Sequence, residues 1–339
     1  MISSQTVTAA SDVAASYRGS DDDARRRLGL AGYLACFKGI VWREILRYLH
    51  QRERFLSALV RPLIWLFIFA AGFRQTLGIS IIPPYETYVL YEEFIAPGLI
   101  AMILLFNAMQ SSLSMVYDRE TGTMRTLLVS PFPRSFLLLS KLLGGVSVAL
   151  IQAYAFMLVA WFWGISPPPI TEVKLFTFYD APSWAGSAIP TMTDPIVTSL
   201  FSVPALIQPF AGYITVIPAI ILAGLMLGSL ALFISSVIKQ LENFAGVMNF
   251  VIFPMFFASS ALYPLWRIRE ASPMLFEICR LNPFTYATEL IRFALYGQVD
   301  TVSLALVIGC TIVFLAAAVF AYNPSKGLIA RRGGPGGSA

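Results

Sequence analysis

Long apolar blocks alternate with short polar segments along most of this chain. A helix needs roughly 20 apolar residues to cross the hydrocarbon core of a bilayer. The blocks therefore predict an all-α polytopic membrane protein, with six transmembrane helices in a domain of residues 58–322. The predicted spans lie at about residues 58–77, 94–116, 136–163, 214–238, 244–262 and 302–322.

The segments at either end have a different pattern. Residues 1–29 are small and polar, and they predict a flexible cytoplasmic arm. Residues 30–57 carry apolar side chains at helical spacing with basic residues beside them, which predicts an N-terminal amphipathic helix at the membrane interface. Residues 323–339 are basic and rich in glycine, and we expect a cytoplasmic tail.

The apolar run at residues 200–237 is longer than one span requires. It contains Pro204, Pro209 and Pro218, which disfavour one straight helix. We predict an interfacial entry segment at residues 201–213 before a single span, and two spans remain the alternative. Residues 164–199, rich in Pro, Ser and Thr, are expected to form an external loop.

Composition supports the membrane class and limits the chemistry. The chain is 57% hydrophobic and 13% charged, against about 45–50% and about 25% in soluble domains. The basic residues are typical of cytoplasmic anchors rather than nucleic-acid binding. Neither the three cysteines, Cys36, Cys279 and Cys310, nor the single His50 has metal-ligand spacing. We expect no catalytic, cofactor-binding or metal-binding residues in this chain.

A few polar residues lie inside the predicted spans. Asn107, Gln110 and Ser111 fall in the second span, and Gln152 lies near the middle of the third. Polar side chains within a span usually face protein or water. These four could serve helix packing or line a substrate path, and both interpretations stay open.

A polar stretch at residues 118–134 separates the second and third spans. Thr121-Gly122-Thr123 can turn the chain and cap a helix, and Pro131 would end that helix. The pattern predicts a short helix on the cytosolic surface of the membrane.

Residues 120–131 read Glu-Thr-Gly-Thr-Met-Arg-Thr-Leu-Leu-Val-Ser-Pro. This stretch resembles the coupling-helix signature of type-2 ATP-binding-cassette (ABC) export permeases, roughly Glu-x-Gly-Thr-Leu-Glu-x-Leu-Leu-x-Thr-Pro. Met124, Arg125 and Ser130 depart from the signature. Arg125 reverses a charge, so its docking partner is expected to carry a complementary acid.

Two further motifs resemble the same family, in the family's order: Phe94-x-x-Pro97-Gly98, and residues 281–287, Leu-Asn-Pro-Phe-Thr-Tyr-Ala. The resemblance implies external re-entrant helices before the last span, with Asn282-Pro283 between them. It does so although Arg267, Arg269, Arg280 and Arg292 in this region would normally favour the cytosol. The external re-entrant motif comprises Asn282, Pro283, Thr285 and Tyr286.

The resemblance also implies a set of residues that couple the permease to an ATPase. They are Arg119, Glu120, Thr121, Gly122, Thr123, Met124, Arg125, Leu127, Leu128 and Pro131.

Glu289 and Arg292 are three residues apart, which predicts a local ion pair on one helix.

The sequence has no Gly-x-x-x-x-Gly-Lys-Ser/Thr phosphate loop. By resemblance, ATP and Mg are bound by a separate cytosolic ABC ATPase subunit. A second permease chain is expected, as a homodimer with a heterodimer left open. We expect a multi-pass bacterial inner-membrane protein in contact with membrane lipid, with both termini cytoplasmic. It would export a lipophilic or lipid-linked substrate, since we expect the spans to bury no charge.

Two other classes of membrane protein fit the sequence less well. An ion-gradient-driven secondary transporter usually has acids within its spans, and predicted spans two to six contain no central Asp or Glu. A membrane-embedded enzyme would need a converging catalytic set, which the sequence does not offer.

Overall fold

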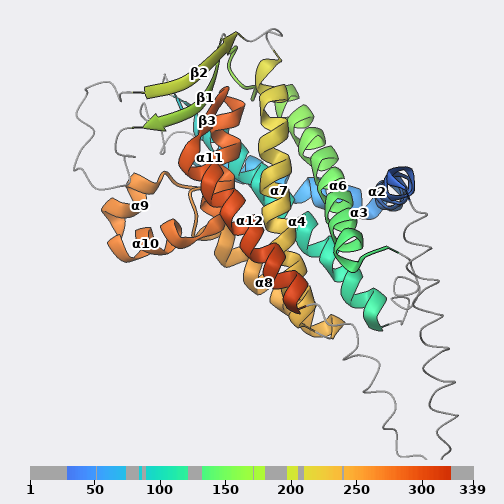
Figure 1. The fold of residues 1–339 in the computed structure, drawn as a ribbon. Coiled ribbons are helices and arrows are strands. Elements are labelled where there is room, and N and C mark those ends of the chain that lie inside the picture. The colour runs from blue at the N-terminus through green and yellow to red at the C-terminus, as the bar shows by residue number, and fades with distance from the viewer. Residues whose placement is uncertain are drawn as a thin grey trace, which may run out of the picture.

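The structure is a computed structural model that describes residues 29–50, 52–73, 84–85, 89–120, 132–170, 172–179, 197–204, 210–238 and 240–321. Most of these residues are helical (Figure 1). The helices are α2 (Leu30–His50), α3 (Arg52–Phe73), α4 (Tyr91–Glu120), α6 (Arg134–Phe162), α7 (Ala211–Val237), α8 (Leu241–Phe257), α9 (Leu265–Ala271), α10 (Pro273–Leu281), α11 (Pro283–Leu295) and α12 (Thr301–Ala321).

Four of the described helices are long and apolar enough to cross a membrane: α4, α6, α7 and α12. They occupy the places of four predicted spans. The other two predicted spans fall on α3 and α8, whose apolar stretches, Ala58–Phe69 and Glu242–Phe257, are shorter. Six spans therefore remain a prediction, within a mostly helical membrane protein.

In the described part of the apolar run at residues 200–237, the one helix is α7. Pro218 lies inside this helix, and a proline can be accommodated in a membrane helix when neighbouring groups satisfy the freed carbonyl. The expected entry segment at residues 201–213 was wrong in part, because residues 201–204 belong to a β-strand.

A small sheet was not predicted. Strands β1 (Glu172–Tyr179), β2 (Val197–Pro204) and β3 (Gln298–Asp300) form one sheet in the order β2-β1-β3. β1 and β2 are antiparallel, with Glu172 opposite Pro204, whereas β1 and β3 are parallel. Aromatic and β-branched residues in both long strands favour this pairing. The expected loop at residues 164–199 thus contains strands that attach it to the chain just before α12.

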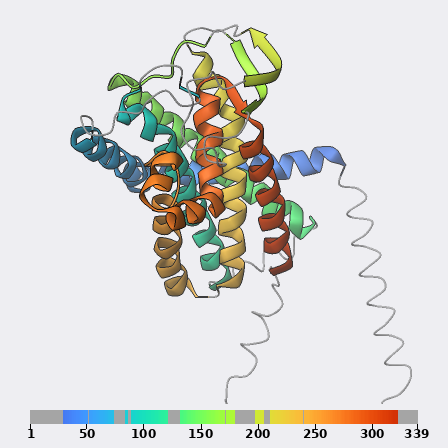
Figure 2. The ribbon, with the colours of Figure 1, turned by 90° about the vertical axis from the view of Figure 1, so that its left-hand side faces the viewer.

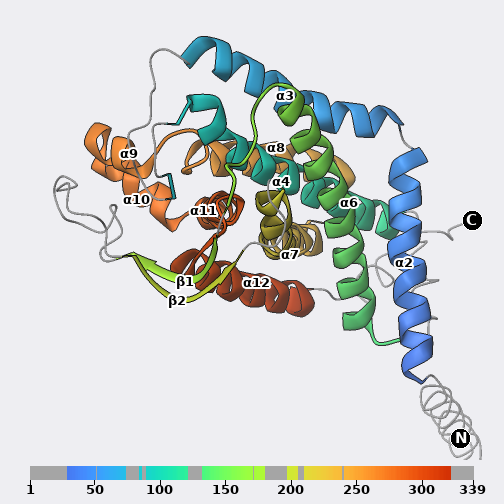
Figure 3. The same cartoon turned by 90° about the horizontal axis from the view of Figure 1, so that it is seen from above.

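The helices differ in direction and in burial. In Figure 3, α7 is seen almost end-on, while α2 and α3 are seen lengthwise and so run across it. α4 is the most enclosed span, with 78% of its apolar window buried, against 11% for α12. It contacts α3, α6, α7, α8 and α11. α4 is therefore central, and α12 presents most of its apolar surface outward.

The chain direction alternates between the two ends of the bundle. In Figures 1 and 2, α4, α7 and α12 end at the lower end, where α6 and α8 begin. The sheet lies at the upper end, beside the starts of α7 and α12. The α4–α6 connection, residues 121–133, therefore joins helix ends on the side opposite the sheet.

Candidate functional site

The predicted coupling element begins at the lower end of α4. Arg119 and Glu120 are the last two residues of this helix. The remaining predicted coupling residues lie outside the described residues, as does the predicted short helix at residues 124–129. These are Thr121, Gly122, Thr123, Met124, Arg125, Leu127, Leu128 and Pro131.

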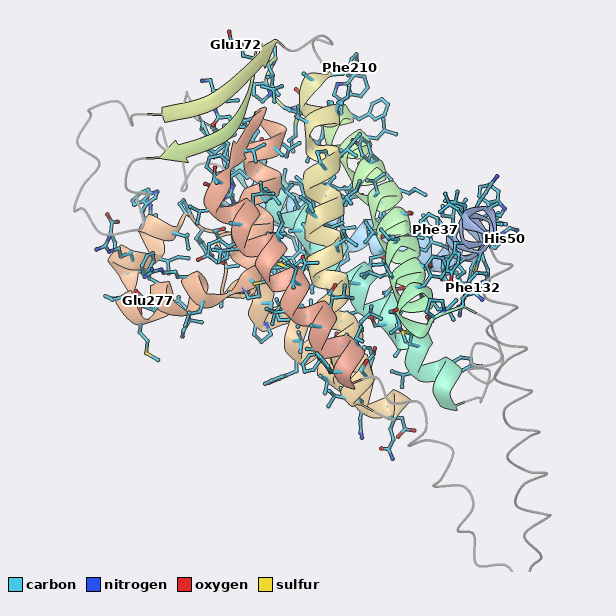
Figure 4. The ribbon with its side chains drawn as sticks, in the orientation of Figure 1. Phe37, His50, Phe132, Glu172, Phe210 and Glu277 are labelled. Carbon is cyan, nitrogen blue, oxygen red and sulfur yellow. The ribbon has the colours of Figure 1, made fainter. Side chains whose placement is uncertain are left out.

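The far end of the α4–α6 connection contacts helix α2. The Tyr33 ring on α2 packs edge-on against Phe132 and Phe136, with ring centroids 5.2 and 5.1 Å apart. Figure 4 shows Phe132 beside α2 near the start of α6. Such aromatic pairs contribute about 0.5–1.5 kcal/mol beyond area burial. The first turn of α2 thus holds the point where the connection enters α6.

A buried hydrogen-bond chain joins α2, α6 and α4. The Asn107 side-chain amide donates to Gln152 Oε1 at 2.7 Å. The Gln152 amide in turn donates to the phenol oxygen of Tyr48. All three side chains are buried. A buried amide needs such partners because an unpaired donor is costly, so the chain fixes α2 against the bundle.

The four predicted path residues come together around two small cavities. Ser111 lines one, beside α6 and α7, and Gln110 and Gln152 line the other, beside α3. Asn107 lines both. The cavities lie about halfway along α4. That these residues line a substrate path stays a prediction.

The expectation that the spans bury no charge was wrong. Lys141 on α6 is buried and lines the first cavity with Ser111 and Ser112. Arg61 on α3 also faces the bundle, since its guanidinium carbon lies 4.0 Å from the ring centroid of Phe106 on α4. Neither arrangement follows from position in the sequence, because each depends on a facing helix.

Asn282 is the junction between α8, α10 and α11. Its amide nitrogen donates to the carbonyls of Met255 and Ala258, at 2.7 and 2.6 Å, near the end of α8. Its Oδ1 accepts from the backbone N–H of Phe284 at 3.0 Å and so caps α11. Pro283 takes the first position of α11, where its missing N–H costs nothing.

Two other residues of the re-entrant motif close the same junction. The Thr285 hydroxyl donates to the carbonyl of Cys279 at 2.7 Å, and the Tyr286 phenol donates to the carbonyl of Arg280 at 2.8 Å. Both carbonyls lie in the last turn of α10, where intrahelical partners are lacking. The motif therefore sets the angle between α10 and α11.

The predicted ion pair between Glu289 and Arg292 is present on α11. Arg292 also makes contacts outside α11. Arg292 is 3% exposed, donates to the carbonyl of Ser260 at 2.8 Å, and lies 4.1 Å from the ring centroid of Phe94. Burial raises the pKa of the nearby Tyr85 phenol, which stays protonated. Arg292 thus ties α11 to the start of α4 and to the segment after α8.

Gly98 explains part of the motif that begins at Phe94. A Cβ atom at Gly98 would lie 2.7 Å from the Cβ and the carbonyl oxygen of Ala261. Only glycine allows this approach between α4 and the segment after α8.

Sequence reasoning missed the roles of Tyr48 and Arg61. The sequence signal for both was a polar side chain on the apolar side of its helix, α2 for Tyr48 and α3 for Arg61.

Within the described parts of the chain, no group of three or more His, Cys, Asp or Glu residues could hold a metal ion. Cys36, Cys279 and Cys310 are free thiols.

A bundle of apolar, membrane-length helices with such polar junctions defines a multi-pass membrane protein. The ABC-2 type transporter family model matches residues 35–179 and 179–296. The chain belongs to this family, which confirms the resemblance found in the motifs. It is therefore a membrane subunit of an ABC transporter and a transport component, not itself catalytic.

Several permeases are similar to the chain. The putative transport permease ycf38 of Cyanophora paradoxa is 28% identical over 243 residues, 70% of this chain and 66% of that protein. The inner membrane transport permease YadH of Escherichia coli K12 is 24% identical, over 84% of this chain and 92% of its own length. The probable multidrug ABC transporter permease YbhR of the same organism is 32% identical over 146 residues, 41% of this chain and 37% of its own.

Proposed function

We propose that this chain is the permease subunit of an ATP-driven exporter. A separate cytosolic ABC ATPase would dock on the α4–α6 connection, and two permease chains would form the membrane part as a homodimer. ATP and Mg would be bound by the ATPase. The observation that carries the proposal is the coupling-helix sequence from Glu120 to Pro131 in a chain without a phosphate loop.

The arrangement of the bundle supports this docking site. Arg119 and Glu120 end the most buried span, α4, so a push on the connection reaches the centre of the bundle directly. A movement of the connection would also reach α2, through the contact of Tyr33 with Phe132. Closure of the ATPase pair on ATP would then shift the permease between two states with different access, since nucleotide binds them with different affinity.

The direction, location and substrate class are further parts of the proposal. The described end of α12 lies at the connection's end of the bundle, so a cytoplasmic connection places the basic tail in the cytoplasm as well. YadH is named an inner membrane permease, and YbhR a probable multidrug permease. We propose export across the inner membrane of a lipophilic or lipid-linked substrate.

The first test is affinity purification of the detergent-solubilised chain from its native host, with mass spectrometry of co-purifying proteins. We expect a stoichiometric protein with a Walker phosphate loop. Cross-linking of the Arg125→Cys variant to that protein would locate the docking site. Recovery of the chain alone, under conditions that preserve an unrelated ABC transporter, would contradict the proposal and favour a gradient-driven transporter.

Direction is tested with the purified complex in liposomes. ATP added outside reaches only complexes with the ATPase facing outward, and exporters in that orientation carry substrate inward. ATP-dependent accumulation of a fluorescent lipid inside the vesicles supports export. ATP-dependent loss of preloaded lipid would indicate the opposite direction.

A further inference from the structure

The second cavity lies between α3, α4 and α6, about halfway through the bundle. Its lining combines one cation and three amides with apolar side chains. It is formed by Ala58, Arg61 and Pro62 of α3, by Met102, Ile103, Phe106, Asn107 and Gln110 of α4, and by Gln152 of α6.

Arg61 supplies the positive charge. It is partly buried, and its guanidinium lies over the Phe106 ring. Among the residues that the structure describes, no carboxylate is paired with it. A cation within a span is costly, and ionisable residues within spans usually mark a substrate or ion pathway. No described acidic side chain supplies a counter-charge for Arg61.

The amides at the cavity differ in how far they are engaged. Asn107 and Gln152 are held by the hydrogen-bond chain that ends at Tyr48. Gln110, by contrast, makes no side-chain hydrogen bond with the described residues. The Arg61 guanidinium likewise makes none, and it carries five N–H donors. Two side chains whose donors have no partner among the described residues thus line one cavity about halfway along α4.

This combination fits an anion with an apolar tail. Phosphate and carboxylate groups accept hydrogen bonds from guanidinium and amide donors, and Met102, Ile103 and Phe106 offer apolar surface beside them. We propose that the Arg61 cavity binds the anionic head group of an amphiphile. This inference deepens the proposed function and rests on it for the step in which the bound amphiphile is transported.

The cavity leaves only about 10 Å³ of free space in the described conformation. That is about the room for one water, so a head group enters only if the lining opens. Arg61 and Gln110 are both partly exposed, so the proposal requires that these two side chains rotate to admit the head group. An anion would then replace the Phe106 ring as the main partner of Arg61.

The head group could belong to a resident membrane lipid or to a transported amphiphile. Both share an anionic head and an apolar tail, and the described contacts do not separate them. Release during ATP turnover distinguishes them, because a transported molecule leaves and a resident lipid stays.

The test uses dodecyl phosphate, with dodecylphosphocholine as the matched zwitterion. Binding to the full chain in phosphatidylcholine nanodiscs, without nucleotide, is measured by native mass spectrometry. We expect dodecyl phosphate to bind and to be weakened about tenfold or more by Arg61→Gln, because that change removes a charge-assisted hydrogen bond. Arg61→Lys should retain most of the binding.

Arg267→Gln is the matched control. Arg267 also lies over an aromatic ring, 5.0 Å from the centroid of Trp266, but it is exposed and distant from the cavity lining. It should leave dodecyl phosphate binding unchanged. Equal binding by the wild type and Arg61→Gln, or equal weakening by Arg267→Gln, would overturn the proposal. Equal binding of dodecyl phosphate and dodecylphosphocholine would do the same.

A second arm adds phosphatidylglycerol to the nanodiscs, together with the ATPase and ATP. Retention of phosphatidylglycerol by the wild type but not by Arg61→Gln supports a lipid head group at Arg61. Loss of dodecyl phosphate on ATP hydrolysis supports transport. The nucleotide-free arm needs no ATPase, so it tests anion binding at Arg61 separately from export. Anion binding can be disproved while the exporter proposal stands, and the exporter proposal can be disproved while anion binding stands.

Discussion

At the scale of single residues, Gly98 allows a close approach between α4 and the segment around Ala261. We predict that Gly98→Ala destabilises the protein by about 1–3 kcal/mol, because the new methyl group overlaps Ala261 and α4 must shift. The measurement is thermal unfolding of the purified protein in detergent, followed by tryptophan fluorescence.

Gly309→Ala is the control for this substitution. Gly309 lies in α12, and a Cβ atom there meets nothing within 4 Å. This variant should be neutral or slightly more stable, since alanine favours the helix over glycine. If both variants unfold at the same temperature, the contact at Gly98 is looser than the structure indicates.

The residue scale also shows where sequence reasoning stops. Gly98 and Asn282 were both found through the motifs that contain them. The physical reason for each lies far away in the sequence, in the segment around Met255 to Ala261. Motif resemblance can identify such positions, but their function as contacts follows only from tertiary structure.

At the scale of elements, the buried pair on α11 provides a sharp comparison. We predict that Glu289→Gln destabilises the protein by about 3 kcal/mol, because it leaves the Arg292 guanidinium buried without its carboxylate. Chemical denaturation monitored by circular dichroism gives the difference in unfolding free energy.

Glu277→Gln on α10 is the matched control. Glu277 pairs with Arg280 at the same spacing and an N–O distance of 3.6 Å, but the two side chains are 59% and 47% exposed. Figure 4 shows Glu277 at the outer edge of the molecule. Its loss should change stability by less than about 0.5 kcal/mol. Similar effects of the two variants would mean that solvent reaches Arg292.

The attachment of α2 gives a second prediction at this scale. Tyr48→Phe removes the acceptor of the Gln152 amide, and we expect a loss of about 0.6 kcal/mol and at most about 2 kcal/mol, as for other hydrogen bonds within membranes. Hydrogen–deuterium exchange of α2 should rise with it. Tyr33→Phe on the same helix keeps the ring contacts with Phe132 and Phe136, so it should change neither measurement.

The hydrophobic pattern located four membrane-length helices, since their length and apolarity are properties of the sequence itself. The family resemblance, rather than this pattern, placed the break at Asn282-Pro283, where α10 ends and α11 begins. The hydrophobic pattern did not find the sheet, because β1 and β3 are distant in sequence and their pairing is long-range. Nor did it show that Lys141 and Arg61 face the bundle, since that depends on how each helix is rotated against its neighbours.

At the scale of the whole molecule, the polar junctions divide by position along the bundle. The Asn282 junction and Arg292 hold α8, α10 and α11 against the start of α4. The Tyr48 chain holds α2 against the middle of α4 and α6. The coupling sequence starts at the lower end of α4. Helix α4 therefore ends at the proposed docking element, lines both polar cavities and contacts α11, as the proposed transmission of an ATPase movement would require.

That arrangement leads to the last prediction. Glu120→Arg reverses a charge at the start of the coupling sequence, and Gly122→Pro removes the glycine of its predicted turn. Both variants should insert and fold normally, yet lose most of the substrate-stimulated ATP hydrolysis of the complex, because the ATPase no longer docks productively.

Glu242→Arg is the control, since Glu242 is an exposed acid in the first turn of α8 at the same end of the bundle. ATP hydrolysis is measured with the reconstituted complex, alongside size-exclusion chromatography to establish folding. Unchanged stimulation in Glu120→Arg, or equal loss in Glu242→Arg, would show that docking does not depend on the connection between α4 and α6.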